Sequence, residues 1–321
     1  MKKILSWNAL PSLSLFLFFF LLYNLTSGGF KSSTLVTFMA TNAGAICVAI
    51  GVTTTILIGG TDISLGAIVT LTNVVMVTLV GKGFSVFPAA LLALLAAVIA
   101  GMINGIIVGF LRVNPLLTTF ATSTVFSGIS LWLLPYPGGY IDFSFNDWYS
   151  SNALGILPMP VIIICFLLLI WIVISKTPFG IWVYAIGCNP HKAYATGIKV
   201  SLLRFFIHTF AGFAAGIGGL CISASICAGN PTIGATMSMT SIASAVIGGV
   251  SLNGGKGNIW GAIFGSMFLS ILVSFVVSIN MSSFVQNFVQ SLILLLGVVC
   301  TILASDKSIR AKIAGLLKKG E

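Results

Sequence analysis

Long apolar runs restrict the fold of this chain more than any other feature of its sequence. Each approaches the roughly 20 residues that a helix needs to cross the hydrocarbon core of a bilayer. Backbone polar groups in lipid must be satisfied within the segment, which favours helices. We therefore predict an all-α membrane protein with about ten transmembrane helices. Windows of about 19 residues place the runs near 10–27, 35–58, 63–80, 88–111, 115–135, 158–175, 203–224, 238–250, 259–279 and 284–304.

The charged residues support this class and exclude a nucleic-acid partner. Only 6% of the 321 residues are charged, against about 25% in soluble domains. The net charge of +10 is spread thinly between apolar runs, apart from a basic tail at 305–321. Such cations, placed between membrane spans, indicate topology through the positive-inside rule.

The same cations predict an orientation. The first run follows two lysines and no soluble segment comes after it, so we interpret it as an uncleaved helix rather than a signal peptide. A cytoplasmic N-terminus then places Arg112, the loop 176–204 and the tail 305–321 inside, and the polar loop 135–152 outside. We expect one transmembrane domain over residues 1–321 with both termini cytoplasmic.

Asp62 lies deep in the apolar sequence, directly after Gly59 and Gly60. An Asp at the bilayer centre costs roughly 2.5–3.5 kcal/mol, so it is kept where it faces a polar cavity, a partner or a helix end. Glycines permit the backbone to break there. We expect an interrupted helix in which Asp62 either contacts a solute or caps the helix that begins near Ser64.

A second break follows the short run 238–250, where residues 248–257 read GGVSLNGGKG. Glycine-rich backbone is tolerated at membrane depth only where protein or water covers it. Both breaks follow Ile-Gly-Gly and precede Gly-Ala-Ile, a match that chance also explains. Paired interrupted segments indicate a transport path. Asn42, Asn73, Asn104, Thr118 and Thr119 either line such a path or form hydrogen bonds between helices.

Two stripes of three glycines, starting at Gly101 and Gly257 and spaced four residues apart, predict close helix contacts. These contacts lie either within one subunit or between subunits. In the loop 176–204, Asn189 suits an N-cap, Pro190 the first helical position and Gly197 the left-handed residue after the last turn. These residues predict a short helix over 191–196. It either docks onto a cytoplasmic partner or only connects two membrane spans.

Motifs for chemistry are missing from the sequence. Lys256 lies in a glycine-rich loop, but Val250 and Gly257 occupy positions where a nucleotide-binding loop needs Gly and Ser or Thr. The two histidines, His191 and His208, have no spaced Cys, Asp or Glu to complete a metal site. We therefore expect no catalytic residues, no metal and no cofactor.

Three ordered motifs resemble the ribose-type permeases of bacterial ABC importers. Residues 59–66 read GGTDISLG, similar to the family's GG-x-D-[LI]-S-[VL]-G signature. Residues 184–189 read YAIGCN, followed by Ala193 and by TGI at 196–198, and resemble its cytoplasmic loop. Residues 247–257 read IGGVSLNGGKG and resemble its second glycine-rich signature. The resemblance covers residues 35–304.

This resemblance implies a permease subunit of the bacterial cytoplasmic membrane that hydrolyses no ATP itself. It implies two ABC ATPase subunits, a second permease of the same or a related chain, and an extracytoplasmic binding protein that delivers a monosaccharide or similar small polar solute. The implied ATPase contacts are Asn189, Pro190, His191, Lys192, Ala193, Tyr194, Ala195, Thr196 and Gly197. The implied translocation region comprises Gly59, Gly60, Asp62, Ser64, Gly248, Gly249, Ser251 and Asn253.

One position departs from the family. Many members have Phe-Arg-Gly where this chain reads Phe126-Ser127-Gly128, which suggests an unequal pair whose other permease supplies the arginine. The alternative function is an ion-coupled secondary transporter that uses Asp62 as its proton or sodium site, since a lone intramembrane carboxylate suits such coupling.

Overall fold

The protein is all-α in the computed structural model, which describes residues 10–26, 29, 32–153 and 157–279 and isolated positions between 285 and 295. The predicted run 284–304 and the tail 305–321 lie outside its continuous ranges. The elements are α1 (Leu10–Thr26), α2 (Ser32–Leu57), α3 (Leu65–Gly81), α4 (Val86–Gly109), α5 (Pro115–Leu133), α6 (Phe143–Ser150), β1 (Asn152–Ala153), β2 (Leu157–Pro158), α7 (Met159–Lys176), α8 (Pro178–Cys188), α9 (Pro190–Ala195), α10 (Val200–Ile226), α11 (Met237–Ile247) and α12 (Ile259–Ser278).

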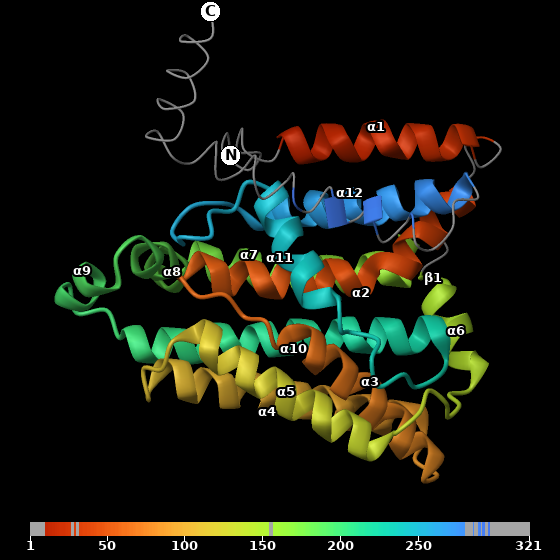
Figure 1. Ribbon diagram of the computed structural model, residues 1–321, viewed down its shortest axis with the longest axis horizontal. Helices are drawn as coiled ribbons and strands as arrows, with labels where there is room; N and C mark the ends of the chain where they lie inside the picture. The colour runs from red at the N-terminus through yellow and green to blue at the C-terminus, as the bar shows by residue number, and fades with distance from the viewer. Residues whose placement is uncertain are drawn as a thin grey trace, which may run out of the picture.

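Six helices in these described ranges are long and apolar enough to cross a membrane, namely α2, α4, α5, α7, α10 and α12. The prediction of an all-α membrane protein is confirmed. Each of the nine predicted runs within the described ranges contains a helix, but α1, α3 and α11 are shorter than the other six. Both α3 and α11 begin inside the bundle rather than at its end (Figure 1), because each follows an irregular segment.

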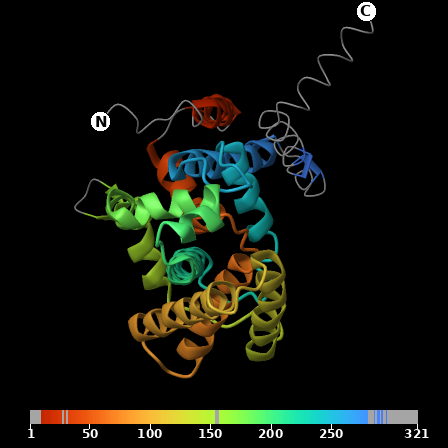
Figure 2. The same ribbon diagram turned by 90° about the vertical axis from the view of Figure 1, so that its left-hand side faces the viewer.

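Helix α10 lies near the middle of the bundle (Figure 2) and packs against α2, α3 and α4. Glycines bring the α4 and α10 backbones together. A Cβ atom on Gly101 would lie 2.7 Å from the His208 carbonyl oxygen and 3.0 Å from the Gly212 Cα atom. The second stripe likewise packs inside the chain, where Gly261 faces the Gly248 carbonyl. Packing within one subunit is therefore confirmed for both stripes.

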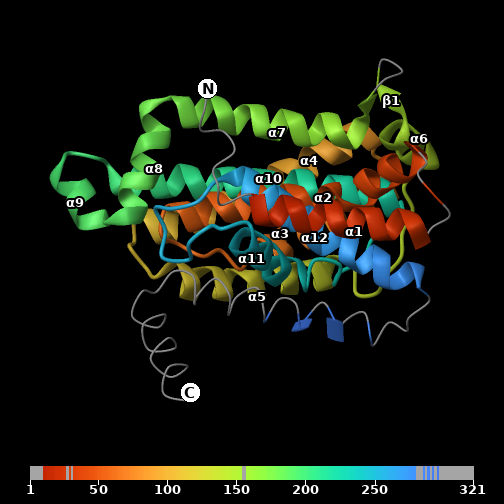
Figure 3. The same cartoon turned by 90° about the horizontal axis from the view of Figure 1, so that it is seen from above.

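The two ends of the bundle differ. Helices α8 and α9 lie at one end, while α6 and the two-stranded β1–β2 hairpin lie at the other (Figure 3). The predicted loop 176–204 is more ordered than its sequence indicates, because it contains α8 as well as α9. Pro178 occupies the first turn of α8, and Val183 and Ile186 are buried in the core. Eleven residues were too few to stand out as a predicted run.

The α4–α10 contact yields a stability prediction. A Cβ atom on Gly105 would lie 2.7 Å from the Phe205 carbonyl oxygen, so Gly105→Leu must separate the two helices. We expect a loss of about 3 kcal/mol, because overpacking costs roughly 1–3 kcal/mol. The midpoint of thermal unfolding in detergent measures it. Gly128→Leu in α5 is the control, since no atom lies within 4 Å of that Cβ position. Equal midpoints for the two variants would contradict close α4–α10 packing.

Candidate functional site

Asp62 lies in the irregular segment between α2 and α3 and is completely buried. Its Oδ1 atom accepts hydrogen bonds from the Ser64 backbone N–H at 2.9 Å and from the Ser64 hydroxyl at 2.6 Å. This turn orders the chain directly before the first residue of α3. Its Oδ2 atom has no hydrogen-bond partner in the part of the chain that the structure describes. The carboxylate therefore orders the start of α3 with one oxygen and leaves the other unpaired.

A chain of side-chain hydrogen bonds connects this turn to α4 and α5. The Asn104 amide donates to the Ser64 hydroxyl at 2.7 Å, and the Thr122 hydroxyl donates to the Asn104 carbonyl oxygen at 2.7 Å. Thr119 accepts from the Ile63 backbone N–H at 3.1 Å. Asn73 plays a similar part elsewhere, donating to Ser223 at 2.9 Å. The interhelical interpretation is thus confirmed for Asn73 and Asn104, whereas Thr119 bonds to the irregular segment between α2 and α3.

Ser238, in the first turn of α11, connects the starts of α3 and α11. Its hydroxyl accepts from the Gly66 backbone N–H at 2.8 Å and donates to the Ile63 carbonyl at 2.5 Å. Gly66 has no room for a side chain, because its Cβ position meets the Gly234 carbonyl. Sequence reasoning missed Ser238. The sequence offered one signal for it. Ser238 lies one turn from Ser241 and two turns from Ser244, so the three serines form a polar face on an otherwise apolar helix.

Helices α2 and α11 end with the same backbone hydrogen bonds. The N–H groups of Gly59 and Gly249 each bond to the carbonyl three residues earlier at 2.9 Å. The next N–H group bonds to the carbonyl five residues earlier, also at 2.9 Å. Both glycines have positive φ, +82° and +80°, as this type of helix end requires. The structure thus pairs Gly59 with Gly249, one residue out of register with the Ile-Gly-Gly match, in which Gly60 corresponds to Gly249.

The two breaks and the end of α8 meet at what we call the glycine junction, formed by Gly59, Gly187, Gly254 and Gly255. The Gly255 N–H donates to the Leu57 carbonyl at 3.0 Å. A Cβ atom on Gly254 would lie 2.7 Å from the Gly59 Cα atom and 2.9 Å from the Gly187 carbonyl oxygen. The three motifs found separately in the sequence therefore touch one another through their backbones.

The residues expected in the translocation region lie in three places. Asp62 and Ser64 are buried at the start of α3, whereas Gly59 belongs to the glycine junction. Gly248 packs against Gly261 of α12. The backbone carbonyl of Ser251 accepts a hydrogen bond from the Gly254 N–H at 2.9 Å, in the turn beside the glycine junction. The Asn253 side chain is exposed. No hydrogen bond among the described residues joins Ser251 or Asn253 to Asp62.

Helix α9 has the predicted local structure. The Asn189 side chain accepts from the Lys192 N–H at 3.0 Å, Pro190 is the first helical residue, and Gly197 has φ +86°. Within α9 only Ala193 is buried, while the Tyr194 side chain is 68% exposed. A groove of about 770 Å³ beside α9 is lined partly by cations: Arg112, Lys199 and Arg204. Helix α9 therefore presents an exposed face beside a basic groove.

Comparison with known proteins identifies the class. Residues 15–298 match the family described as "Branched-chain amino acid transport system / permease component". The chain is 35% identical to the ribose import permease RbsC of Bacillus subtilis over 67% of both chains. It is 32% identical to the D-allose permease AlsC of Escherichia coli over 64% of both. No solved structure matches the chain.

This chain belongs to that permease family. It is a multi-pass protein of the bacterial cytoplasmic membrane, and its resemblance to the ribose-type permeases is confirmed. A third relative, 30% identical over 67% of this chain and 70% of its own length, is the galactose/methyl galactoside import permease MglC of Salmonella typhimurium. The fold and the helix breaks described above are therefore those of a transport permease.

The turn at Asp62 yields a second prediction. Asp62→Asn keeps an oxygen that accepts from the Ser64 N–H, whereas Asp62→Ala removes both hydrogen bonds. We expect Asp62→Ala to lose about 1 kcal/mol more stability than Asp62→Asn, the usual value for a lost side-chain cap. Thermal unfolding in detergent compares them. If both variants lose the same stability, the charge rather than the hydrogen-bond acceptor orders the start of α3.

Proposed function

We propose that this chain is the permease subunit of an ATP-binding-cassette importer that moves a monosaccharide or similar small polar solute. Three relatives are named import permeases for ribose, D-allose and galactose, which supports the solute class. One structural observation carries the mechanism. An exposed, capped helix, α9, is connected through α8 and the glycine junction to both helix breaks. Partner ATPases supply the energy, and a binding protein delivers the solute.

The proposed orientation places the α9 end in the cytoplasm, with about ten crossings, both termini inside and one domain over residues 1–321. The distribution of charge supports it. Among the described residues, the α9 end contains Arg112, Lys192 and Lys256, whereas the opposite end contains Asp142, Asp147 and one lysine, Lys82. Hydrogen bonds from the Ser144 hydroxyl and N–H lower the pKa of the Asp142 carboxyl, which favours its charged form.

Coupling follows from how rigidly α9 is attached to the breaks. ATP binding draws the two ATPases together and displaces α9, and α8 passes this movement to the glycine junction. Backbone atoms touch there, so little displacement is absorbed by side-chain rotation. The ends of α2 and α11 move together, and the interface between two permeases opens alternately to each side. ATP drives this cycle only because it binds the two states with different affinity.

The second permease of the complex is either another copy or a related chain. Phe126 is buried, but Ser127 is only partly buried and Gly128 is exposed with no atom near its Cβ position. An arginine from a related partner has space there, which supports the unequal pair. A purified homodimer that transports by itself would exclude this arrangement.

Gly197 provides the mutational test of coupling. Proline cannot adopt its φ of +86°, nor donate its hydrogen bond to the Tyr194 carbonyl at 3.0 Å. We expect Gly197→Pro, like deletion of residues 191–196, to leave the protein in the membrane but to uncouple ATP hydrolysis from uptake. Parallel assays of ATP hydrolysis and uptake in proteoliposomes measure this ratio.

Gly83→Pro is a matched control. Gly83 has φ +90°, donates to the Val80 carbonyl at 2.9 Å and has open space around it, but it lies at the opposite end of the bundle. It should suffer the same local strain and keep uptake coupled to hydrolysis. Normal coupling in Gly197→Pro would count against α9 as the ATPase contact.

The relatives, which are named import permeases, do not support the alternative of an ion-coupled transporter that uses Asp62. Purification from the native membrane in mild detergent, followed by mass spectrometry and uptake assays, separates the two. We expect a stoichiometric ATPase, uptake that requires ATP, and transport retained in Asp62→Asn. The chain recovered alone, with uptake that follows an ion gradient and is abolished in Asp62→Asn, would refute the importer.

A further inference from the structure

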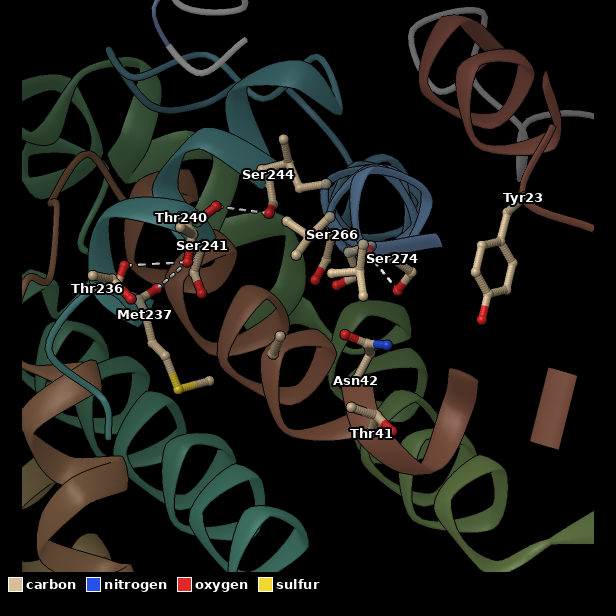
Figure 4. Close-up of a pocket in the computed structure, with 15 residues that line it drawn as sticks. Tyr23, Thr41, Asn42, Thr236, Met237, Thr240, Ser241, Ser244, Ser266 and Ser274 are labelled. Atoms are coloured by element: carbon tan, nitrogen blue, oxygen red, sulfur yellow. Dashed lines mark hydrogen bonds between the residues drawn. The ribbon is translucent and has the colours of Figure 1, made fainter. Parts of the chain in front are cut away.

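A pocket of about 490 Å³ lies between α1, α2, α11 and α12 (Figure 4), and none of the residues predicted for translocation lines it. Its volume falls within the roughly 300–1,000 Å³ typical of small-molecule sites. Nine of its fifteen lining residues have hydroxyl groups, one has an amide and none is charged. We call it the hydroxyl pocket. Residues that represent its four walls are Tyr23, Thr41, Asn42, Ser241, Ser266 and Ser270.

The hydroxyls supply both acceptors and donors. Ser244 donates to the Thr240 carbonyl at 2.7 Å, and Ser274 donates to the Ser270 carbonyl at 3.1 Å, so their oxygens are left as acceptors. Ser241 and Ser266 are only 2% and 3% exposed. Neither has a side-chain hydrogen bond in the part of the chain that the structure describes. Neither hydroxyl is among the fully buried polar atoms, and both residues line the pocket, so the two hydroxyls are available to a ligand.

The lining selects one class of ligand. An ion or a zwitterion would leave its charge unpaired, because none of the described lining residues is charged. Hydroxyl groups of a ligand can donate to Ser244 and accept from Ser241 and Ser266. Leu269 and Val273, also in the lining, offer apolar contact to carbon-bound hydrogens. An uncharged, polyhydroxylated molecule therefore matches this pocket.

The pocket is connected to the first helix break. Thr236 and Met237, at the start of α11, line it. The next residue, Ser238, bonds to Ile63 and Gly66 at the start of α3. Movement of α11 must therefore change the shape of the pocket and also the contact between α11 and α3. We propose that the hydroxyl pocket is a solute transit site of this permease and takes an uncharged polyhydroxylated solute. This inference rests on the proposed function.

The test uses the intact importer in proteoliposomes. Wild-type uptake of ribose, allose and galactose with ATP first identifies the best solute of the three, which is then compared with a deoxy analogue. Ser241→Ala and Ser266→Ala are assayed separately, so that one remains informative if the other fails to fold. Ser130→Ala is the control, since Ser130 is a buried α5 hydroxyl that bonds to the Phe126 carbonyl at 2.9 Å and does not line the pocket.

We expect each pocket variant to raise the KM for uptake about tenfold, the effect of one lost hydrogen bond at the strong end of the usual range. The preference for the solute over its deoxy analogue should also shrink, a change that a general loss of stability would not produce. Ser130→Ala should leave both quantities unchanged.

Other outcomes overturn the inference in distinguishable ways. If both pocket variants transport with wild-type KM and wild-type discrimination, the hydroxyl pocket is not the transit site and the importer function stands. If they raise KM without altering discrimination, the serines act through packing and the proposed contact is wrong. If the wild type takes up none of the three monosaccharides with ATP, the monosaccharide part of the proposed function fails, and the inference that rests on it fails too.

Discussion

Direct contact between glycine backbones is the constraint on which this structure depends. Lipid tails are as apolar as leucine, so helices in a bilayer gain little by hiding apolar side chains from their surroundings. Close approach of backbones replaces that force, at Gly101 and Gly212 between α4 and α10 and at Gly248 and Gly261 between α11 and α12. The glycine junction applies the same contact to irregular segments. A bond from the Gly255 N–H to the Leu57 carbonyl satisfies backbone groups where two helices have stopped.

Features set by neighbouring residues could be predicted from the sequence. The cap at Asn189, the left-handed Gly197 and the helix between them depend on a few adjacent positions, and all were confirmed. The apolar runs predicted nine helices within the described ranges for the same reason. Of the two roles considered for Asp62, the structure shows that it orders the start of α3.

Features set by distant residues could not be predicted. The sequence gives no sign that Gly59, Gly187 and Gly254 touch, because the contacts join segments more than 60 residues apart. The role of Ser238 was hidden for the same reason. Helix α8 was missed because it is short and is ordered by tertiary packing of Val183 and Ile186. The two breaks end their helices identically, yet only the hydrogen bonds revealed the correct register.

The bond between Gly66 and Ser238 has a consequence for biosynthesis. The two residues are 172 positions apart, so the ribosome delivers α3 to the membrane long before its partner exists. Until α11 emerges, the first turn of α3 has a backbone N–H without this acceptor, beside a buried carboxylate. Until then, water or the insertion machinery must provide a hydrogen-bond acceptor for that N–H group. The region around Asp62 therefore reaches its final form late in synthesis, and a chain truncated before α11 lacks a completed break.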